Sequence, residues 1–318
     1  MWWYLRLMKK WDWARNRSIK KMRTKVADPR QRAMLNDQYN KLTGKGWQLF
    51  HRLYAKIFRD ITYPVSEGEW KVYFMKKEIV LPLRKEHIWL DWDVAVSVLG
   101  HDPEIKKTYE DLIRSGHVKL FFDIGANYGT HSLLFLVNGI KTIAFEPNSS
   151  LKKEFDLYCR LNNVTGSMEN LALGDKNGIV NFWFQPHETW NGSIVDTVVD
   201  KLKDGEQPVK LEVVLTTLDD YVQQNNLQPS LLKIDTEGNE INVLKGAIKT
   251  INTARPFILF ETNAFEERAA LWSFFFFLDY LIYTLPYSPF RPGPVLSEQQ
   301  FLIKWANNYI AVPAKKQT

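Results

Sequence analysis

Carboxylates with short, regular spacing follow two apolar segments in the second half of this 318-residue chain. Asp235 and Glu237 come directly after one segment, and Glu261 and Asn263 end the next. If both segments are parallel strands, their carboxyl ends lie at one edge of a sheet and these side chains could converge. Carboxylates so placed can take a proton as a general base or bind Mg²⁺ through hard oxygen ligands. Either chemistry would activate a weakly nucleophilic hydroxyl.

A turn with two glycines follows an earlier apolar run that ends at Asp123. It contains Gly125, Asn127 and Gly129 and leads into a predicted helix. Glycines let the backbone turn sharply and let a ligand approach the N-terminus of the helix. A dinucleotide fingerprint would need glycine at positions 125, 127 and 130, but Asn127 and Thr130 occupy two of these. The turn therefore disfavours NAD.

Glu146 ends the next apolar run and is followed by Pro147 and Asn148. A carboxylate at this strand end can accept hydrogen bonds from both hydroxyls of a ribose. Dinucleotides and other nucleoside cofactors both use such an acid, so Glu146 alone does not discriminate between them. Combined with the glycine turn, it predicts a nucleoside cofactor other than NAD.

The elements that position these residues are short apolar runs that alternate with helical patterns from Val118 onward. This alternation predicts parallel βαβ units and a doubly wound α/β sheet. Residues 33–117 are expected to be mostly helical or mixed, with a hairpin near 70–83 and a helix near 104–115. The predicted strands lie in VKLFFDIG, TIAFEP, MENLALGD, LLKIDTEG, PFILFET, YLIYTL and NNYIAVP.

The basic charge of the chain is confined to its N-terminus. Residues 1–32 carry eleven Lys or Arg and two Asp, whereas the other 286 residues have a net charge of −3. This distribution removes the inference from a basic isoelectric point to a nucleic-acid-binding fold, because the bulk of the chain is slightly acidic. Four Trp in the first thirteen residues and a basic helical pattern are typical of helices that lie on an anionic membrane. Packing against the protein itself or a partner subunit is the alternative.

Neither a signal peptide nor a membrane-spanning helix is expected. Met1 to Leu5 is the only uncharged run before Arg6, and the longest later run is broken by polar residues. The single Cys159 excludes a disulfide framework and is expected to be an inert core residue. We therefore expect a cytoplasmic protein that could lie peripherally on the inner face of a membrane.

Seven motifs between about residues 118 and 313 together resemble the FkbM family of methyltransferases. The most specific is the block that begins at Ile234 and contains Asp235, Glu237, Gly238 and Glu240. The resemblance leaves residues 1–60 uncovered. In chain order, the motifs are FFDIGANYGTHS, AFEPN, ENLALGDKNG, TTLDDY, KIDTEGNEINVLKGA, RPFILFE and NNYIAVP.

The resemblance implies a Rossmann-like class I methyltransferase sheet with S-adenosylmethionine as methyl donor. It also implies O-methylation of a hydroxyl on a sugar, polysaccharide, glycolipid or related natural product. Three parts are expected: a basic arm (1–32), a framing region (33–117) and a methyltransferase domain (118–313). The cofactor-binding residues implied are Asp123, Gly125, Ala126, Asn127, Gly129, Thr130, Glu146, Pro147, Asn148, Ala172 and Leu173.

Two hypotheses describe how the acceptor hydroxyl is activated. In the first, Asp235 or Glu237 is the general base, while Glu261 and Asn263 hold substrate hydroxyls. In the second, Asp235, Glu261 and Asn263 bind Mg²⁺ or a similar ion, as in metal-dependent methyltransferases of small natural products. We prefer the metal-free version, because the FkbM resemblance implies no metal. His131 is a further candidate base, with a packed helix residue as the alternative.

Three further features leave alternatives open. Residues 190–193 could form a substrate-facing loop or a plain surface insertion. The run Phe274 to Phe277 is expected to end a helix before an aromatic strand, with part of it free for an oligomer or membrane contact. An inactive, membrane-associated scaffold with a methyltransferase fold is the alternative to an enzyme. The oligomeric state and the identity of the acceptor stay open.

Overall fold

The computed structural model describes residues 67–84, 86–87, 90–91, 94–95, 98, 102–185, 188–195, 207–262, 265–304 and 306–314. The chain divides into two compact units, Met1–His101 and Asp102–Thr318. Some predictions fall outside the described residues: those for the arm 1–32, for most of residues 33–101 and for Asn263.

In the first unit, a hairpin joins β1 (Gly68–Phe74) and β2 (Lys77–Leu83), which pair in antiparallel register. Met75 and Lys76 form its two-residue turn, and both have positive φ angles, as this tight turn requires. The predicted hairpin is confirmed. The predicted helix near 104–115 is α5 (Pro103–Arg114), which falls in the second unit.

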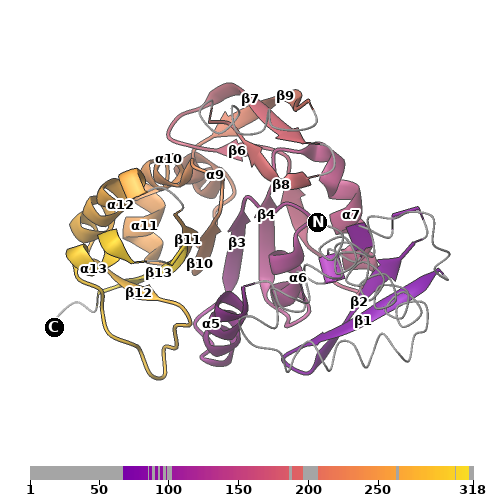
Figure 1. Cartoon of the computed structure of the whole chain (residues 1–318), viewed down its shortest axis with the longest axis horizontal. Coiled ribbons are helices and arrows are strands. Elements are labelled where there is room, and N and C mark those ends of the chain that lie inside the picture. Colours follow the sequence, from indigo (N-terminus) through magenta and orange to yellow (C-terminus); the bar gives the residue numbers. More distant parts are fainter. Residues whose placement is uncertain are drawn as a thin grey trace, which may run out of the picture. The chain divides into compact units, whose positions relative to one another are not determined.

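A seven-stranded sheet forms the centre of the second unit, in the order β12-β13-β11-β10-β3-β4-β5 (Figure 1). The five strands from β11 to β5 are parallel, which confirms the predicted doubly wound α/β class. The bounds are β3 (Leu120–Ile124), β4 (Lys141–Phe145), β5 (Ser167–Glu169), β10 (Leu231–Ile234), β11 (Phe257–Glu261), β12 (Tyr280–Thr284) and β13 (Asn308–Pro313).

One part of the strand prediction is wrong. β13 lies between β11 and β12 and pairs antiparallel with both, so it alone runs against the other strands of this sheet. After α13 (Glu298–Ile303) the chain returns to the sheet between two strands that are already in place, and strand–helix alternation alone did not reveal the direction of this last strand.

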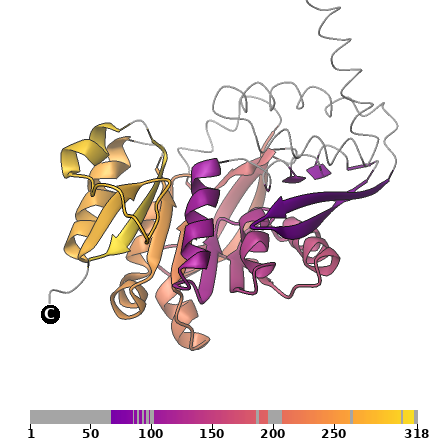
Figure 2. The ribbon, with the colours of Figure 1, turned by 90° about the horizontal axis from the view of Figure 1, so that it is seen from below.

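Helices cover both faces of this sheet (Figure 2). One face carries the larger core, in which Phe122, Ile234 and Phe260 are fully or almost fully buried. The other includes Phe155 and the buried Cys159, whose pKa burial raises to about 11. The bounds are α6 (Thr130–Leu136), α7 (Lys152–Leu161), α9 (Leu218–Gln224), α10 (Glu240–Lys245), α11 (Ile248–Ala254), α12 (Phe265–Phe277) and α13 (Glu298–Ile303).

A second, four-stranded sheet in the order β6-β9-β7-β8 was not predicted. Phe182 and Phe184 alternate along one strand and Val213 and Leu215 along another, so a small core covers one of its faces. The predicted loop at 190–193 is instead part of a strand. The bounds are β6 (Ala172–Leu173), β7 (Gly178–Gln185), β8 (Glu188–Ser193) and β9 (Val209–Thr216).

The phenylalanine run behaves as predicted, since α12 ends at Phe277 and leads into β12. Phe275 is buried, whereas Phe276 and Phe277 are 66% and 80% exposed. Within the described residues, no helix is both long and apolar enough to cross a bilayer.

Candidate active site

A pocket opens at the carboxyl ends of β3, β4 and β10. The strand order reverses here, between β3 and β10, which is where doubly wound sheets bind their ligands. The pocket holds about 540 Å³ of empty space, its open mouth included. It is lined by Ile124, Gly125, Asn127, Phe145, Glu146, Pro147, Leu171, Ala172, Leu173, Phe182, Gly192, Ser193, Ile194, Asp235, Thr236, Glu237 and Asn239.

The glycine turn forms one wall of the pocket, and each glycine is required by a close contact within the protein. Gly125 has a φ of +75°, and a Cβ there would lie 1.8 Å from the carbonyl oxygen of Asp235. A Cβ on Gly129 would lie 2.3 Å from the ring of Phe155. Asn127, where a dinucleotide fingerprint has glycine, also adopts a positive φ of 51°, which asparagine tolerates.

Glu146 lies next to this turn, with its carboxylate held by two backbone groups. Oε2 accepts a hydrogen bond from Asn127 N at 2.8 Å, and Oε1 accepts one from Asn148 N at 2.9 Å. Burial raises the pKa of Glu146 to about 7, although these two bonds act in the opposite direction. The plane of the carboxylate is thereby fixed, while each oxygen keeps a second lone pair.

The predicted cofactor residues separate into two groups. Gly125, Asn127, Glu146, Pro147, Ala172 and Leu173 line the pocket. Asp123, Ala126, Gly129, Thr130 and Asn148 lie behind its surface. Asn148, for example, accepts hydrogen bonds from Ser150 N and Oγ at the start of a short 3₁₀ turn.

Asp123 is fully buried behind the glycine turn. Its Oδ2 accepts hydrogen bonds from Ser132 N at 3.0 Å and Ser132 Oγ at 2.7 Å, at the first turn of α6. Its Oδ1 lies 3.8 Å from Lys233 Nζ. Asp123 thus joins β3 to α6 and to a buried cation on β10.

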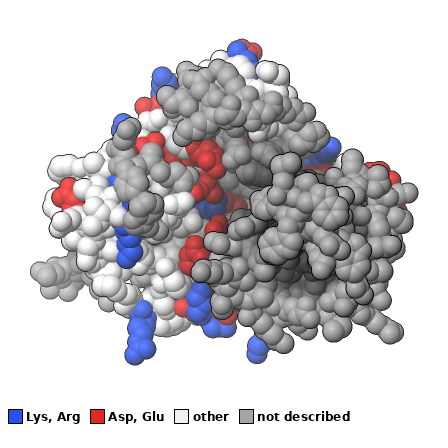
Figure 3. All heavy atoms as spheres, viewed as in Figure 1, with Lys and Arg blue, Asp and Glu red and all other residues white. Residues whose placement is uncertain are grey.

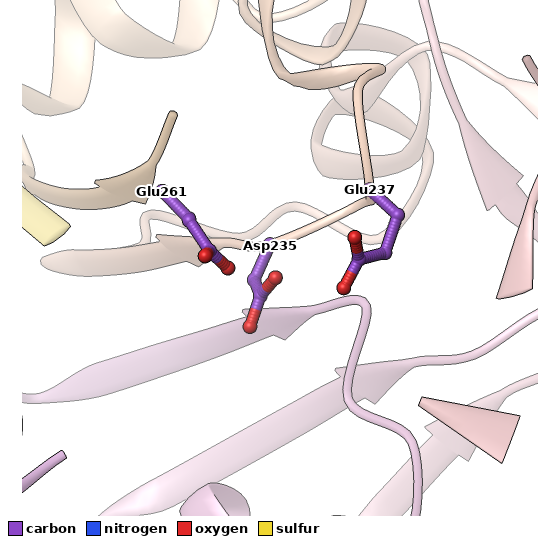
Figure 4. Close-up of side chains that lie close together, drawn as sticks. All are labelled: Asp235, Glu237 and Glu261. Atoms are coloured by element: carbon purple, nitrogen blue, oxygen red, sulfur yellow. The ribbon is translucent and has the colours of Figure 1, made fainter. Parts of the chain in front are cut away.

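Next to the glycine turn, carboxylate oxygens of Asp235, Glu237 and Glu261 all lie within 4.8 Å of one another, and the first two of these residues line the pocket. Figure 4 shows Asp235 between the other two, which come from the loop after β10 and from the end of β11. Figure 3 shows acidic side chains gathered near the middle of this face of the molecule. The predicted convergence of these three side chains is therefore present.

The three acids differ in charge. Burial and the neighbouring Asp235 carboxylate raise the pKa of Glu261 to about 9 and that of Glu237 to about 7. Burial opposes ionisation of Asp235 as well, but Lys233 and a hydrogen bond from Glu261 hold its pKa below the ordinary value. Near neutral pH, Glu261 therefore favours its protonated form and Asp235 its carboxylate, while Glu237 lies in the range where it can take up or release a proton.

Glu240 maintains the loop that carries Glu237. Its carboxylate accepts hydrogen bonds from Thr236 N at 2.7 Å, Thr236 Oγ1 at 2.9 Å and Gly238 N at 3.0 Å. Glu237 and Gly238 both have positive φ angles in this loop. Within this block, Glu237 therefore lines the pocket, whereas Glu240 supports the backbone of the loop that carries Glu237.

The small sheet completes the pocket on the side of Glu237. Ser193 Oγ donates a hydrogen bond to the carbonyl oxygen of Glu237 at 3.0 Å, and Gly192 and Ile194 line the pocket. Asn239 Nδ2 donates to the carbonyl oxygen of Leu173 at 2.9 Å. The segment predicted to be a variable loop or insertion thus lies against the loop of the acidic block.

His131 does not line the pocket. It lies in the first turn of α6, and its Nδ1 is 2.8 Å from the hydroxyl of Tyr109 in α5. This geometry agrees with the alternative that His131 is a packed helix residue. A catalytic role for His131 stays a prediction. Sequence reasoning included Ser193 only as part of the segment 190–193 and did not single out Lys233, although a lysine inside the apolar run LLKI was a usable signal.

The chain has measurable likeness to known proteins. It is similar to the methyltransferase FkbM from Methylobacillus flagellatus KT, with 15% identity and a TM-score of 0.39, over 72% of this chain and 59% of that one. It is also similar to the SAM-dependent methyltransferase from Agrobacterium tumefaciens, with 10% identity and a TM-score of 0.37, over 80% of this chain and 72% of that one. No curated protein matches it.

A family model, the methyltransferase FkbM domain, matches residues 123–288, slightly more than half of the chain. This range contains every residue that lines the pocket, together with all three acids of the cluster. The chain belongs to the FkbM methyltransferase family.

Proposed function

We propose that this chain is an O-methyltransferase that uses S-adenosylmethionine to methylate a hydroxyl of a sugar, glycan or related natural product. The observation that carries the proposal is one pocket with Glu146 on one wall and the Asp235–Glu237 pair on another. The Glu146 carboxylate suits the ribose of a nucleoside, and the Asp235–Glu237 pair suits a hydroxyl that must lose a proton.

The residues around the pocket fit the cofactor. Glu146 offers two fixed oxygens to the ribose hydroxyls, and Gly125 and Asn127 present the turn beside it. Pro147, Ala172 and Leu173 supply apolar surface for the nucleobase of the cofactor. When bound, S-adenosylmethionine supplies an electrophilic methyl group on a sulfonium.

Glu237 is the best-placed general base. It lines the pocket, and its pKa of about 7 lets a large fraction be ionised at neutral pH while it still binds a proton well. In such a transfer the acceptor oxygen would form its bond to the methyl carbon while the carbon–sulfur bond of the donor breaks and S-adenosylhomocysteine leaves, and Glu237 would take the proton of the acceptor hydroxyl. Asp235 is a weaker base because Lys233 stabilises its charged form.

A metal-assisted version is less well supported. Lys233 Nζ lies 2.9 Å from Asp235 Oδ2, and Glu261 donates a proton in its hydrogen bond to Asp235. One oxygen of Asp235 is therefore already engaged by the Lys233 ammonium. We keep the metal-free hypothesis.

Two measurements test the proposal. Isothermal calorimetry with S-adenosylhomocysteine should give a binding heat for the wild type, and Glu146→Ala should weaken the affinity at least about tenfold. Transfer of labelled methyl to a panel of sugars should label at least one hydroxyl. A folded wild type that gives no binding heat would favour the scaffold alternative instead.

The arm 1–32 supports a second, separate proposal, about location. Its Trp-rich, basic composition favours contact with an anionic membrane surface, where lipid-linked glycans are built. Packing against the protein's own body or a partner subunit is the competing outcome. Neither proposal depends on the other.

A further inference from the structure

Lys233 is a buried cation in the middle of β10. Its neighbours in the strand, Leu232 and Ile234, are fully buried, and Lys233 itself is 5% exposed. An ammonium in such a place is stable only if it is paired, because its hydration is lost on burial. Lys233 Nζ lies 2.9 Å from Asp235 Oδ2 and 3.8 Å from Asp123 Oδ1, which together supply that pairing.

Strand geometry fixes this arrangement. Lys233 and Asp235 are two residues apart along one strand direction, so their side chains leave the same face of the sheet. Asp123 on β3 is the direct register partner of Lys233 on β10. The three side chains therefore meet because of strand alternation and pairing, which leave the ammonium little freedom to move.

Each carboxylate next to Lys233 is attached to a different part of the site. Asp123 holds the start of α6 through Ser132, just after the glycine turn. Asp235 receives a hydrogen bond from Glu261 on β11 and lies beside Glu237. Lys233 is thus the charged link between the wall that carries the glycine turn and the wall that carries the acids.

We propose that Lys233 is a positioning residue for methyl transfer: its ammonium keeps Asp235 an oriented carboxylate between Glu261 and Glu237. This inference rests on the proposed function, because it assigns Glu237 the proton of the acceptor hydroxyl. A negative Asp235 makes Glu237 a stronger base, whereas a neutral Asp235 would leave Glu237 a weaker one. Lys233 itself touches neither substrate nor cofactor, since it does not line the pocket.

The kinetic test compares Lys233→Met with Lys233→Arg and with Lys245→Met, which removes an exposed lysine from α10. For Lys233→Met we expect kcat to fall about 100-fold, as for the loss of a tuned base, with KM and the Kd for S-adenosylhomocysteine within about threefold. Lys233→Arg keeps the charge and should recover part of kcat, and Lys245→Met should match the wild type. A folded Lys233→Met with unchanged kcat overturns the proposal.

A second test needs no acceptor. In ¹³C-labelled protein, the carboxyl carbon of Asp235, assigned with Asp235→Asn, should report a carboxylate in the wild type at pH 7. In Lys233→Met it should move to the position of a protonated acid. An unchanged carboxylate signal overturns the proposal. If Lys233→Met does not fold, Lys233→Met with Asp123→Asn removes one buried carboxylate along with the cation, and the same two readouts apply.

The two tests separate this inference from the proposed function. The wild type could fail to bind S-adenosylhomocysteine and to transfer methyl, yet still show the Lys233-dependent signal of Asp235. That result would disprove the proposed methyltransferase activity and leave the role of Lys233 in keeping Asp235 charged. A wild type that transfers methyl while Lys233→Met does so equally well would disprove the role of Lys233 alone.

Discussion

The carbonyl oxygen of Asp235 lies 1.8 Å from the point that a Cβ on Gly125 would occupy. The glycine turn and the acidic block, 110 residues apart in sequence, are therefore in direct backbone contact. Gly125 is required by the protein itself as well as by any ligand that approaches the turn. A side chain there would push the two walls of the pocket apart.

Gly125→Ala is therefore expected to damage both folding and binding. The clash with backbone and the positive φ together should cost about 3 kcal/mol or more of the free energy of unfolding. Gly139→Ala is the matched control, because Gly139 has a φ of +78° but nothing within 4 Å of its Cβ position. It should cost only about 1 kcal/mol. Urea unfolding and calorimetry with S-adenosylhomocysteine measure both effects, and equal costs would refute the clash.

Glu237→Gln should separate binding from chemistry. We expect kcat to fall about 10²- to 10⁴-fold, with cofactor affinity little changed, because only the proton acceptor is lost. In the wild type, kcat should rise with pH through about 7, where Glu237 ionises, and this limb should vanish in the variant. Glu212→Gln, on the exposed side of β9, serves as control. A variant that keeps the wild-type rate would exclude Glu237 as the base.

Glu261 should make the protein less stable as pH rises. Its folded pKa of about 9 lies above its ordinary value of 4.5, so the folded state binds the proton more tightly than the unfolded state. Stability is thus full below pH 4.5 and falls as pH rises toward 9. Glu261→Gln, which mimics the protonated acid, should gain about 1 to 3 kcal/mol at pH 8 and little at pH 5. Thermal unfolding across this range checks it, and a gain that is equal at both pH values would contradict it.

The parallel core of the fold was predictable because each strand has a continuous apolar run and each candidate acid stands where a run stops. Asp235, Glu237 and Glu261 were found in this way, and the structure brings them within 4.8 Å. The small sheet was missed because its outer face is polar or exposed, as at Lys210 and Glu212, so its strands resemble a surface insertion.

Lys233 was missed for a different reason. Its importance depends on register with Asp123, and register between strands distant in sequence is set by the whole sheet. The motif likewise predicted Asp123 as a cofactor-binding residue. In the structure Asp123 is buried behind the glycine turn, where it accepts a hydrogen bond from Ser132 N. Local spacing identified the participants, whereas tertiary packing determined which of them face the pocket.

Removal of residues 1–32 tests the location proposal. If the arm contacts an anionic surface, the full chain should sediment with vesicles that contain phosphatidylserine, more weakly at high salt, and the truncated chain should stay in solution. Neutral phosphatidylcholine vesicles are the control, and transfer to soluble acceptors should persist after truncation. Equal sedimentation of both chains would exclude the arm as the membrane contact and leave packing against the protein itself or a partner subunit as its role.

Exhaustive chelation tests how the acceptor hydroxyl is activated. Because Lys233 lies 2.9 Å from Asp235 and Glu261 donates a hydrogen bond to it, the acid cluster already has its balancing cation and proton. We expect methyl transfer to be undiminished after treatment with EDTA and removal of the chelate by gel filtration. Lys233→Met, in which this cation is lost, is the informative comparison, since added Mg²⁺ could then compete for the freed carboxylates. Loss of wild-type activity on chelation, restored by Mg²⁺, would instead make Asp235 and Glu261 ligands and assign the activation of the hydroxyl to the ion.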